Sequence, residues 1–101
     1  MNAIDANLRL SGQRALLGAI YPEVRLVKLR RDGTRITFTA ICDQTFSDEA
    51  LDALTTAAAE IAADFPACDV DERIVGSTAP LPAEDVLMEG WLFQRAEPNV
   101  S

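Results

Sequence analysis

The segment from residue 46 to 66 constrains the fold most, because it is typical of one amphipathic helix with a marked start and stop. Ser47 is placed to cap the helix, and the two acidic residues after it suit the positive end of the helix dipole. We expect Phe46 and Leu51 to form a hydrophobic staple, and Pro66 to end the helix. Spacings of three and four residues predict one apolar stripe, made of Leu51, Leu54, Ala58, Ile61 and Phe65.

Two β-rich runs, 24–31 and 35–42, flank the dipeptide Asp32-Gly33. An Asp-Gly pair between such runs is a strong signal for a β-hairpin with a two-residue turn. The sequence therefore predicts two antiparallel strands at this point.

A turn at Asp32-Gly33 would set the register of the whole hairpin. Leu29 would then lie opposite Ile36, and Arg25 opposite Ala40, on the core face. On the other face Arg30 would lie opposite Arg35, a like-charged pair that costs stability unless water or a partner's carboxylates lie between. Lys28 joins these two arginines in a compact basic patch.

The remaining elements complete an α-β-β-α-β-β order. We expect a first helix over 7–20, a third strand over 68–75 with Cys68, Val70 and Ile74 on one side, and a last strand over 86–95. The first helix has a predicted apolar side made of Leu10, Leu16, Leu17 and Ile20. The simplest packing is an α+β two-layer sandwich, with a four-stranded, mostly antiparallel sheet and both helices on one face.

Length and composition fit one globular domain. The chain has 101 residues, of which 49% are hydrophobic and 25% charged, so we expect a single domain over 1–101 with loose ends at 1–6 and 97–101. No apolar run approaches the roughly 20 residues that span a bilayer, and the first residues lack the pattern of a signal peptide. We therefore expect a cytoplasmic protein.

The inventory of reactive residues argues against an enzyme. The chain contains no histidine, which removes Ser-His and Cys-His nucleophile pairs and most zinc and iron ligand sets. Cys42 and Cys68 sit in apolar settings; we read them as reduced thiols, although a disulfide between them stays open. We predict no catalytic residue, no cofactor and no metal site.

Charge is unevenly distributed along the chain. Residues 1–40 hold seven basic and three acidic side chains, whereas residues 41–101 hold two basic and thirteen acidic ones. Between Asp43 and Glu72 there are nine carboxylates and no basic side chain, which predicts a strongly negative surface.

This acidic surface admits three interpretations: a solvated surface, a docking face for a basic protein, or, least in keeping with the spacing, a metal site. For the docking face we name Asp48, Glu49, Asp52, Glu60, Asp64, Asp69, Asp71 and Glu72. A second possible interface consists of Lys28, Arg30, Arg35 and Trp91, which lacks the aromatic interleaving of a nucleic-acid site.

The sequence also resembles a group of short bacterial α/β proteins, most of them without an assigned activity. The similarity covers nearly the whole chain and rests on Arg14-Ala15-Leu16-Leu17-Gly18, Pro22, Val24-Arg25, Asp32-Gly33, Ser47-Asp48-Glu49, Glu60-Ile61-Ala62-Ala63-Asp64-Phe65-Pro66, Asp71-Glu72 and Pro80-Leu81-Pro82. Members of that group occur near polymorphic toxin genes, as small cytoplasmic immunity proteins do. This chain departs from the group in a more Ala-rich helix and in Ala83-Glu84-Asp85.

Two functional hypotheses follow. The first is a non-enzymatic immunity-type inhibitor that covers a basic toxin surface with its acidic helix. The second is a homodimeric structural or regulatory module that buries the open face of its sheet.

Overall fold

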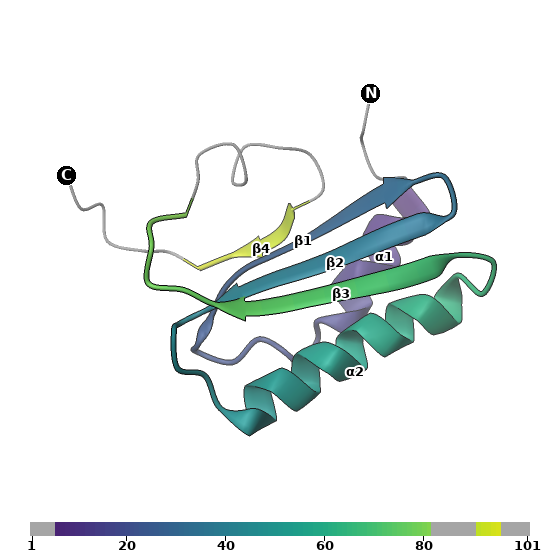
Figure 1. The fold of residues 1–101 in the computed structure, drawn as a ribbon. Helices are drawn as coiled ribbons and strands as arrows, with labels where there is room; N and C mark the ends of the chain where they lie inside the picture. Colours follow the sequence, from purple (N-terminus) through teal and green to yellow (C-terminus); the bar gives the residue numbers. More distant parts are fainter. Residues whose placement is uncertain (1–5, 82–90, 96–101) are drawn as a thin grey trace.

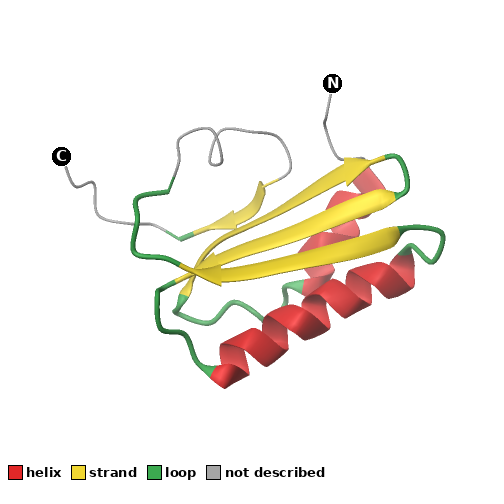
Figure 2. Ribbon diagram, viewed as in Figure 1, coloured by secondary structure: helices red, strands yellow, loops and turns green. Residues whose placement is uncertain are grey.

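The computed structural model describes residues 6–81 and 91–95, which form two helices and a four-stranded sheet (Figure 1). The elements are α1 (Ala6–Ala15), β1 (Val24–Asp32), β2 (Arg35–Cys42), α2 (Asp48–Asp64), β3 (Asp69–Gly76) and β4 (Trp91–Gln94). Both helices lie on the same side of the sheet (Figure 2). The predicted α+β two-layer sandwich is therefore confirmed, in the predicted element order.

The sheet has the strand order β3-β2-β1-β4. β1 is antiparallel to both of its neighbours, while β2 and β3 are parallel. Parallel neighbours need a crossover connection, and α2 supplies it. Its 17 residues extend about 25 Å at 1.5 Å each, close to the roughly 26 Å of an eight-residue strand, so the chain returns to the level where β2 began.

α2 begins where the sequence predicted. The Ser47 hydroxyl accepts a hydrogen bond from the Ala50 amide at 3.1 Å, which confirms the cap. The buried side consists of Ala50, Leu54, Ala57, Ala58 and Ile61. Around the helix axis, Leu51 and Ala57 each lie about 60° from the buried Leu54, on opposite sides of it. The side with Ala57 faces the sheet, and the side with Leu51 faces solvent. The prediction that Leu51 belongs to the buried stripe is therefore wrong, because it is exposed.

The hairpin turn lies one residue later than predicted. Asp32 pairs with Arg35, so the turn residues are Gly33 and Thr34. Gly33 has a φ of +63°, and no residue other than glycine has a positive φ in the described chain. A positive φ at only the first turn position is the pattern of a type II′ turn, which favours glycine there, whereas an Asp-Gly type I′ turn would also force Asp32 to positive φ.

The later turn changes every predicted cross-strand pair of the hairpin but not which strand face packs against the core. Leu29 lies opposite Phe38 rather than Ile36, and Arg30 lies opposite Thr37. Residues 26–32 of β1 each pair with a residue of β2 two positions further along than predicted. Because side chains alternate between the faces with a period of two, this shift leaves the predicted core face unchanged. The expected pair of Arg30 and Arg35 does not form, since Arg35 faces Asp32.

α1 is shorter than the predicted helix over 7–20. Gly18 has a φ of +78°, the left-handed conformation that commonly follows a helix end, and the chain turns away after Ala15. As a result Leu17 lies outside the helix and is 79% exposed. Leu10 lies inside α1 but on its solvent side and is 52% exposed, so the prediction that both belong to the apolar side is wrong. The buried side of α1 consists of Leu8, Ser11, Gly12 and Ala15.

β3 begins and ends one residue later than predicted, and Val70 and Ile74 pack against the core as expected. For the last strand, residues 91–94 are confirmed, whereas the predicted start at 86–90 lies outside the described residues. β4 is an edge strand.

Neither helix of the described chain has the length and apolarity to cross a membrane.

Candidate functional site

Four carboxylates of α2 form a uniformly acidic surface among the described residues. Asp48, Glu49, Asp52 and Glu60 are exposed, and no basic side chain of the described residues forms an ion pair with any of them. No described cation therefore offsets their negative charge. This part of α2 therefore presents a negative potential to solvent.

Asp64, at the end of α2, has a structural role. It accepts a hydrogen bond of 2.6 Å from the hydroxyl of Ser11, a residue that is only 2% exposed, and its carboxylate lies 3.6 Å from the Arg14 guanidinium. These contacts join α2 to α1. Asp64 is thus less available to a partner than the other helix carboxylates.

The three predicted carboxylates of β3 do not share one surface. Side chains alternate along a strand, so Asp69 and Asp71 lie on the face opposite Val70, which packs against the core, whereas Glu72 lies on the helix side. The predicted acidic set is therefore divided between the helix side of the sheet, where α2 and Glu72 lie, and the outer face with Asp69 and Asp71.

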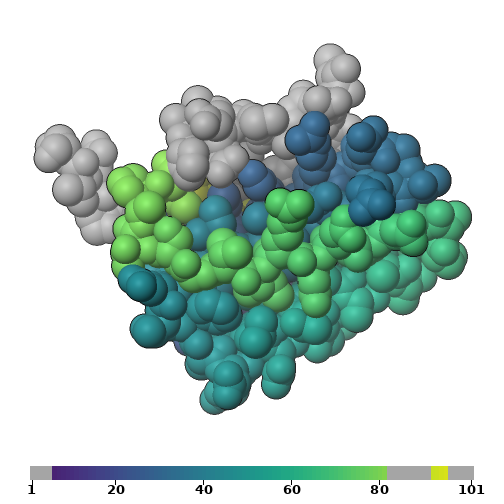
Figure 3. Space-filling view, viewed as in Figure 1, coloured from purple at the N-terminus to yellow at the C-terminus, as the bar shows by residue number. Residues whose placement is uncertain are grey.

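That outer face carries both signs of charge. Register places Lys28 and Arg30 of β1 on it, with Arg35 of β2, and Arg35 forms an ion pair with Asp71. Figure 3 shows β3, in green, between the blue hairpin and the teal α2 on the viewed face. Trp91 begins β4 and pairs with Lys28, but its side chain lies outside the described part of the chain. The predicted basic patch is thus bordered by carboxylates.

A groove of about 380 Å³ runs between α2 and the segment that follows α1. Glu49, Asp52, Thr56 and Glu60 line it on the helix side, at the spacing of one helical stripe. Its interior is lined by small side chains, those of Ala15, Ala19, Ala53 and Ala57, with Tyr21 beside them. The hollow exists because alanines stand where larger side chains would fill the space.

The other wall of the groove was missed by the sequence prediction. It contains Leu17 and Gly18, and Leu17 was assigned to the buried side of a longer helix. The available signal was Gly18 itself, since a glycine near the end of a periodic segment is typical of a helix end. Reading it as the stop would have placed Leu17 outside the helix and in solvent.

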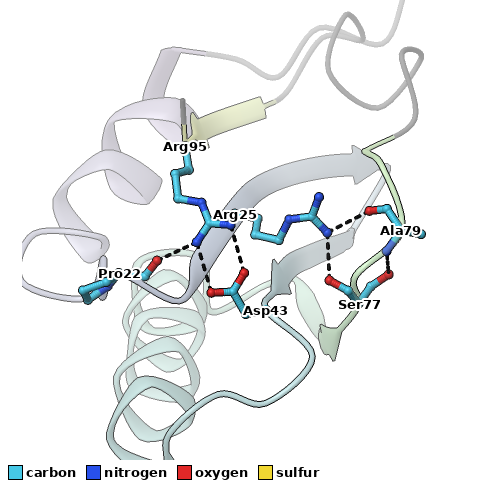
Figure 4. A network of polar contacts seen from close by, with 6 residues as sticks. All are labelled: Pro22, Arg25, Asp43, Ser77, Ala79 and Arg95. Carbon is cyan, nitrogen blue, oxygen red and sulfur yellow. Dashed lines mark hydrogen bonds and ion pairs between the residues drawn. The ribbon is translucent and has the colours of Figure 1, made fainter. Parts of the chain in front are cut away.

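A polar network lies where β1 begins and where β2, β3 and β4 end (Figure 4). Arg25 is 5% exposed, sits at a register shift in β1 and donates to the carbonyls of Ser77 and Ala79 at 2.8 and 2.9 Å. Beside it, Arg95 binds both carboxylate oxygens of Asp43. Arg25 was predicted to face Ala40 on the core side; instead its buried charge is compensated by the chain that follows β3.

The described residues show no grouping of three or more His, Cys, Asp or Glu side chains suited to a metal ion. Cys42 is buried, and burial, together with the nearby charges of Asp43 and Glu23, raises the pKa of its thiol. A raised pKa disfavours the nucleophilic thiolate.

A family model described as MafI2 immunity protein matches residues 5–97. The chain belongs to the MafI2 immunity protein family. The match extends over all six elements of the fold, so MafI2 membership concerns the entire sandwich. It confirms the resemblance to immunity-type proteins at the level of the family. No curated protein matches the chain.

Proposed function

We propose that this MafI2-family chain is an immunity-type inhibitor that binds a toxin through the acidic surface of α2, formed by Asp48, Glu49, Asp52 and Glu60. Family membership supports the class of function. The observation that carries the choice of surface is that these four carboxylates are exposed and have no basic partner among the described residues.

A partner that fits this surface has basic side chains at its own binding site. Opposite charges would accelerate association and make it sensitive to salt, because exposed charges are screened over about 8 Å at physiological ionic strength. The net charge of the chain, −7, acts in the same direction. Inhibition is by occupation of the toxin surface, without catalysis and without a cofactor, in the cytoplasm.

The test is growth rescue followed by a binding measurement. A candidate toxin domain from the gene neighbourhood of this chain is expressed in bacteria with and without the chain, and binding of the two purified proteins is measured at low and raised salt. We expect restored growth and an affinity that falls as salt rises. Rescue that fails, with no complex at low salt, would contradict the inhibitor function.

The surface itself is tested by neutral variants. Asp48→Asn, Asp52→Asn and Glu60→Gln together should weaken the complex at low salt by at least about tenfold, since each removes one attractive charge. The matched control neutralises Asp69, Asp71 and Glu72 of β3. Unchanged affinity in the α2 variant would place the binding surface elsewhere.

A second candidate is self-association through the outer sheet face. The observation that favours it is that Lys28 and Arg30 share this face with Asp69, so a twofold axis could bring opposite charges together. Sedimentation at high protein concentration decides: a dimer mass supports this candidate, and a strictly monomeric mass rejects it.

A further inference from the structure

We propose that the groove between α2 and the segment from Ala15 to Tyr21 receives a lysine or arginine side chain of the toxin, with an apolar neighbour of that side chain packed on Leu17. This inference rests on the proposed function and names the part of the acidic surface that holds the partner.

Charge determines the kind of side chain that fits. Glu49, Asp52 and Glu60 all line the groove, and no described basic side chain lines it with them. These carboxylates follow one wall of the groove, and a cation seated between Asp52 and Glu60, about 12 Å apart along the helix axis, would be attracted by both. The groove is partly enclosed by protein, so such a cation is screened less than one on the flat surface of the helix.

The shape of the groove fits a side chain that projects from another protein. A volume of about 380 Å³ lies in the lower part of the range for binding sites, and the groove is open along its length. Its alanine interior suits the aliphatic stem of a lysine or arginine, while the carboxylates at the rim meet the charged end. A side chain entering from a docked surface satisfies both requirements.

Leu17 supplies the apolar part of the contact. It is 79% exposed, the largest exposed fraction among the described large hydrophobic residues, and it stands at the groove rather than at a distance from it. The positive φ of Gly18 turns the chain here and leaves Leu17 outside the core. An apolar side chain packed beside an ionic contact excludes water from that contact and so strengthens it.

The decisive variant places a cation in the groove. Thr56→Arg introduces a guanidinium between Asp52 and Glu60, which lie four residues before and after it on the helix and would hold it there. Thr55→Arg is the matched control: it makes the same substitution on the neighbouring exposed residue, which does not line the groove. Both variants change the net charge equally.

We expect Thr56→Arg to weaken binding to the toxin domain by about a hundredfold, and Thr55→Arg by only a few-fold, because only the first fills the site. Equal weakening by the two variants would show that general charge steers the partner, which would overturn the groove while leaving the proposed function intact. Absence of binding by the unaltered chain would overturn both.

A second pair of variants tests the apolar contact. Leu17→Ala should weaken binding by about tenfold, and Leu10→Ala, which truncates another exposed leucine away from the groove, should leave it unchanged. Circular dichroism confirms folding in each case. If Leu17→Ala binds as tightly as the unaltered chain, the apolar part of the inference is wrong.

Discussion

The Arg95 guanidinium binds both carboxylate oxygens of Asp43, at 2.9 and 3.1 Å, and also donates to the carbonyl of Pro22 at 2.8 Å. One side chain thereby joins the end of β4 to the end of β2 and to the chain entering β1. This arrangement attaches an edge strand of four residues that has few backbone contacts of its own.

The same ion pair makes stability depend on acid. The hydrogen bond from Arg95 is the main reason that the pKa of Asp43 lies below its ordinary value of 3.8. A carboxyl with a lowered folded-state pKa contributes its full stability above the unfolded value and loses it as the pH falls through the folded value. We expect the urea midpoint to decrease below pH 3.8, and to decrease less in Asp43→Asn.

Asp52→Asn is the control for the acid experiment, because Asp52 is exposed, lies beyond the first turn of α2 and has no ion pair among the described residues. Its midpoint should follow that of the unaltered chain at every pH. An identical acid response in Asp43→Asn and the unaltered chain would contradict a role for the ion pair.

Removing the cap of α2 should destabilise the fold. Ser47→Ala deletes the acceptor for the Ala50 amide, and we expect a loss of about 1 kcal/mol in the free energy of unfolding, measured by urea denaturation. The Ser47 backbone amide also donates to the Glu23 carboxylate, at 3.2 Å, and the substitution leaves this amide in place. Ser47→Asn, which keeps a side-chain acceptor, should recover most of the loss; an unaffected alanine variant would argue against the cap.

Two glycines should respond differently to alanine. A Cβ on Gly76 would lie 2.7 Å from the Gln44 carbonyl oxygen and 2.9 Å from that of Asp43, and backbone cannot move aside easily. We expect Gly76→Ala to cost about 1–3 kcal/mol in urea denaturation. A Cβ on Gly12 would meet only the terminal methyl groups of Leu29 and Leu92, which can rotate, and alanine favours the helix by about 1 kcal/mol. A larger loss for Gly12→Ala would contradict this difference.

The two cysteines should remain reduced within one chain. Cys42 pairs with Gly76 at one end of β2, while Cys68 directly precedes the pair of Asp69 and Arg35 at the other end, so about 23 Å separates them along the strands. A disulfide cannot bridge that distance. Thiol titration without reductant should find two thiols in denaturant. In the native protein Cys68 should react first, because Cys42 is buried with a raised pKa; equal native rates would contradict this assignment.

Local interactions explain the successes of the sequence prediction. Ser47 caps the helix through an amide three residues away, and alternation along β3 correctly oriented Val70 and Ile74. Each signal depends on neighbours within one turn or one strand, so it is visible without the fold. The hairpin prediction failed by one residue because glycine suits both the second position of a type I′ turn and the first position of a type II′ turn. Which of the two turns forms at Gly33 depends on how favourably the two strands pair in each register.

The candidate site likewise combines local features, which the sequence predicts, with features that depend on tertiary packing. The sequence by itself determined that α2 is a capped helix with carboxylates on its outer side, because helix periodicity and residue type are sufficient for that. Only the tertiary structure decided that Asp64 binds Ser11, that Asp69 and Asp71 lie on the other face of the sheet, and that Leu17 stands beside Glu60 in one groove. These relationships join residues far apart in the chain, and their geometry comes from how α1 and β3 pack against α2, which no local pattern encodes.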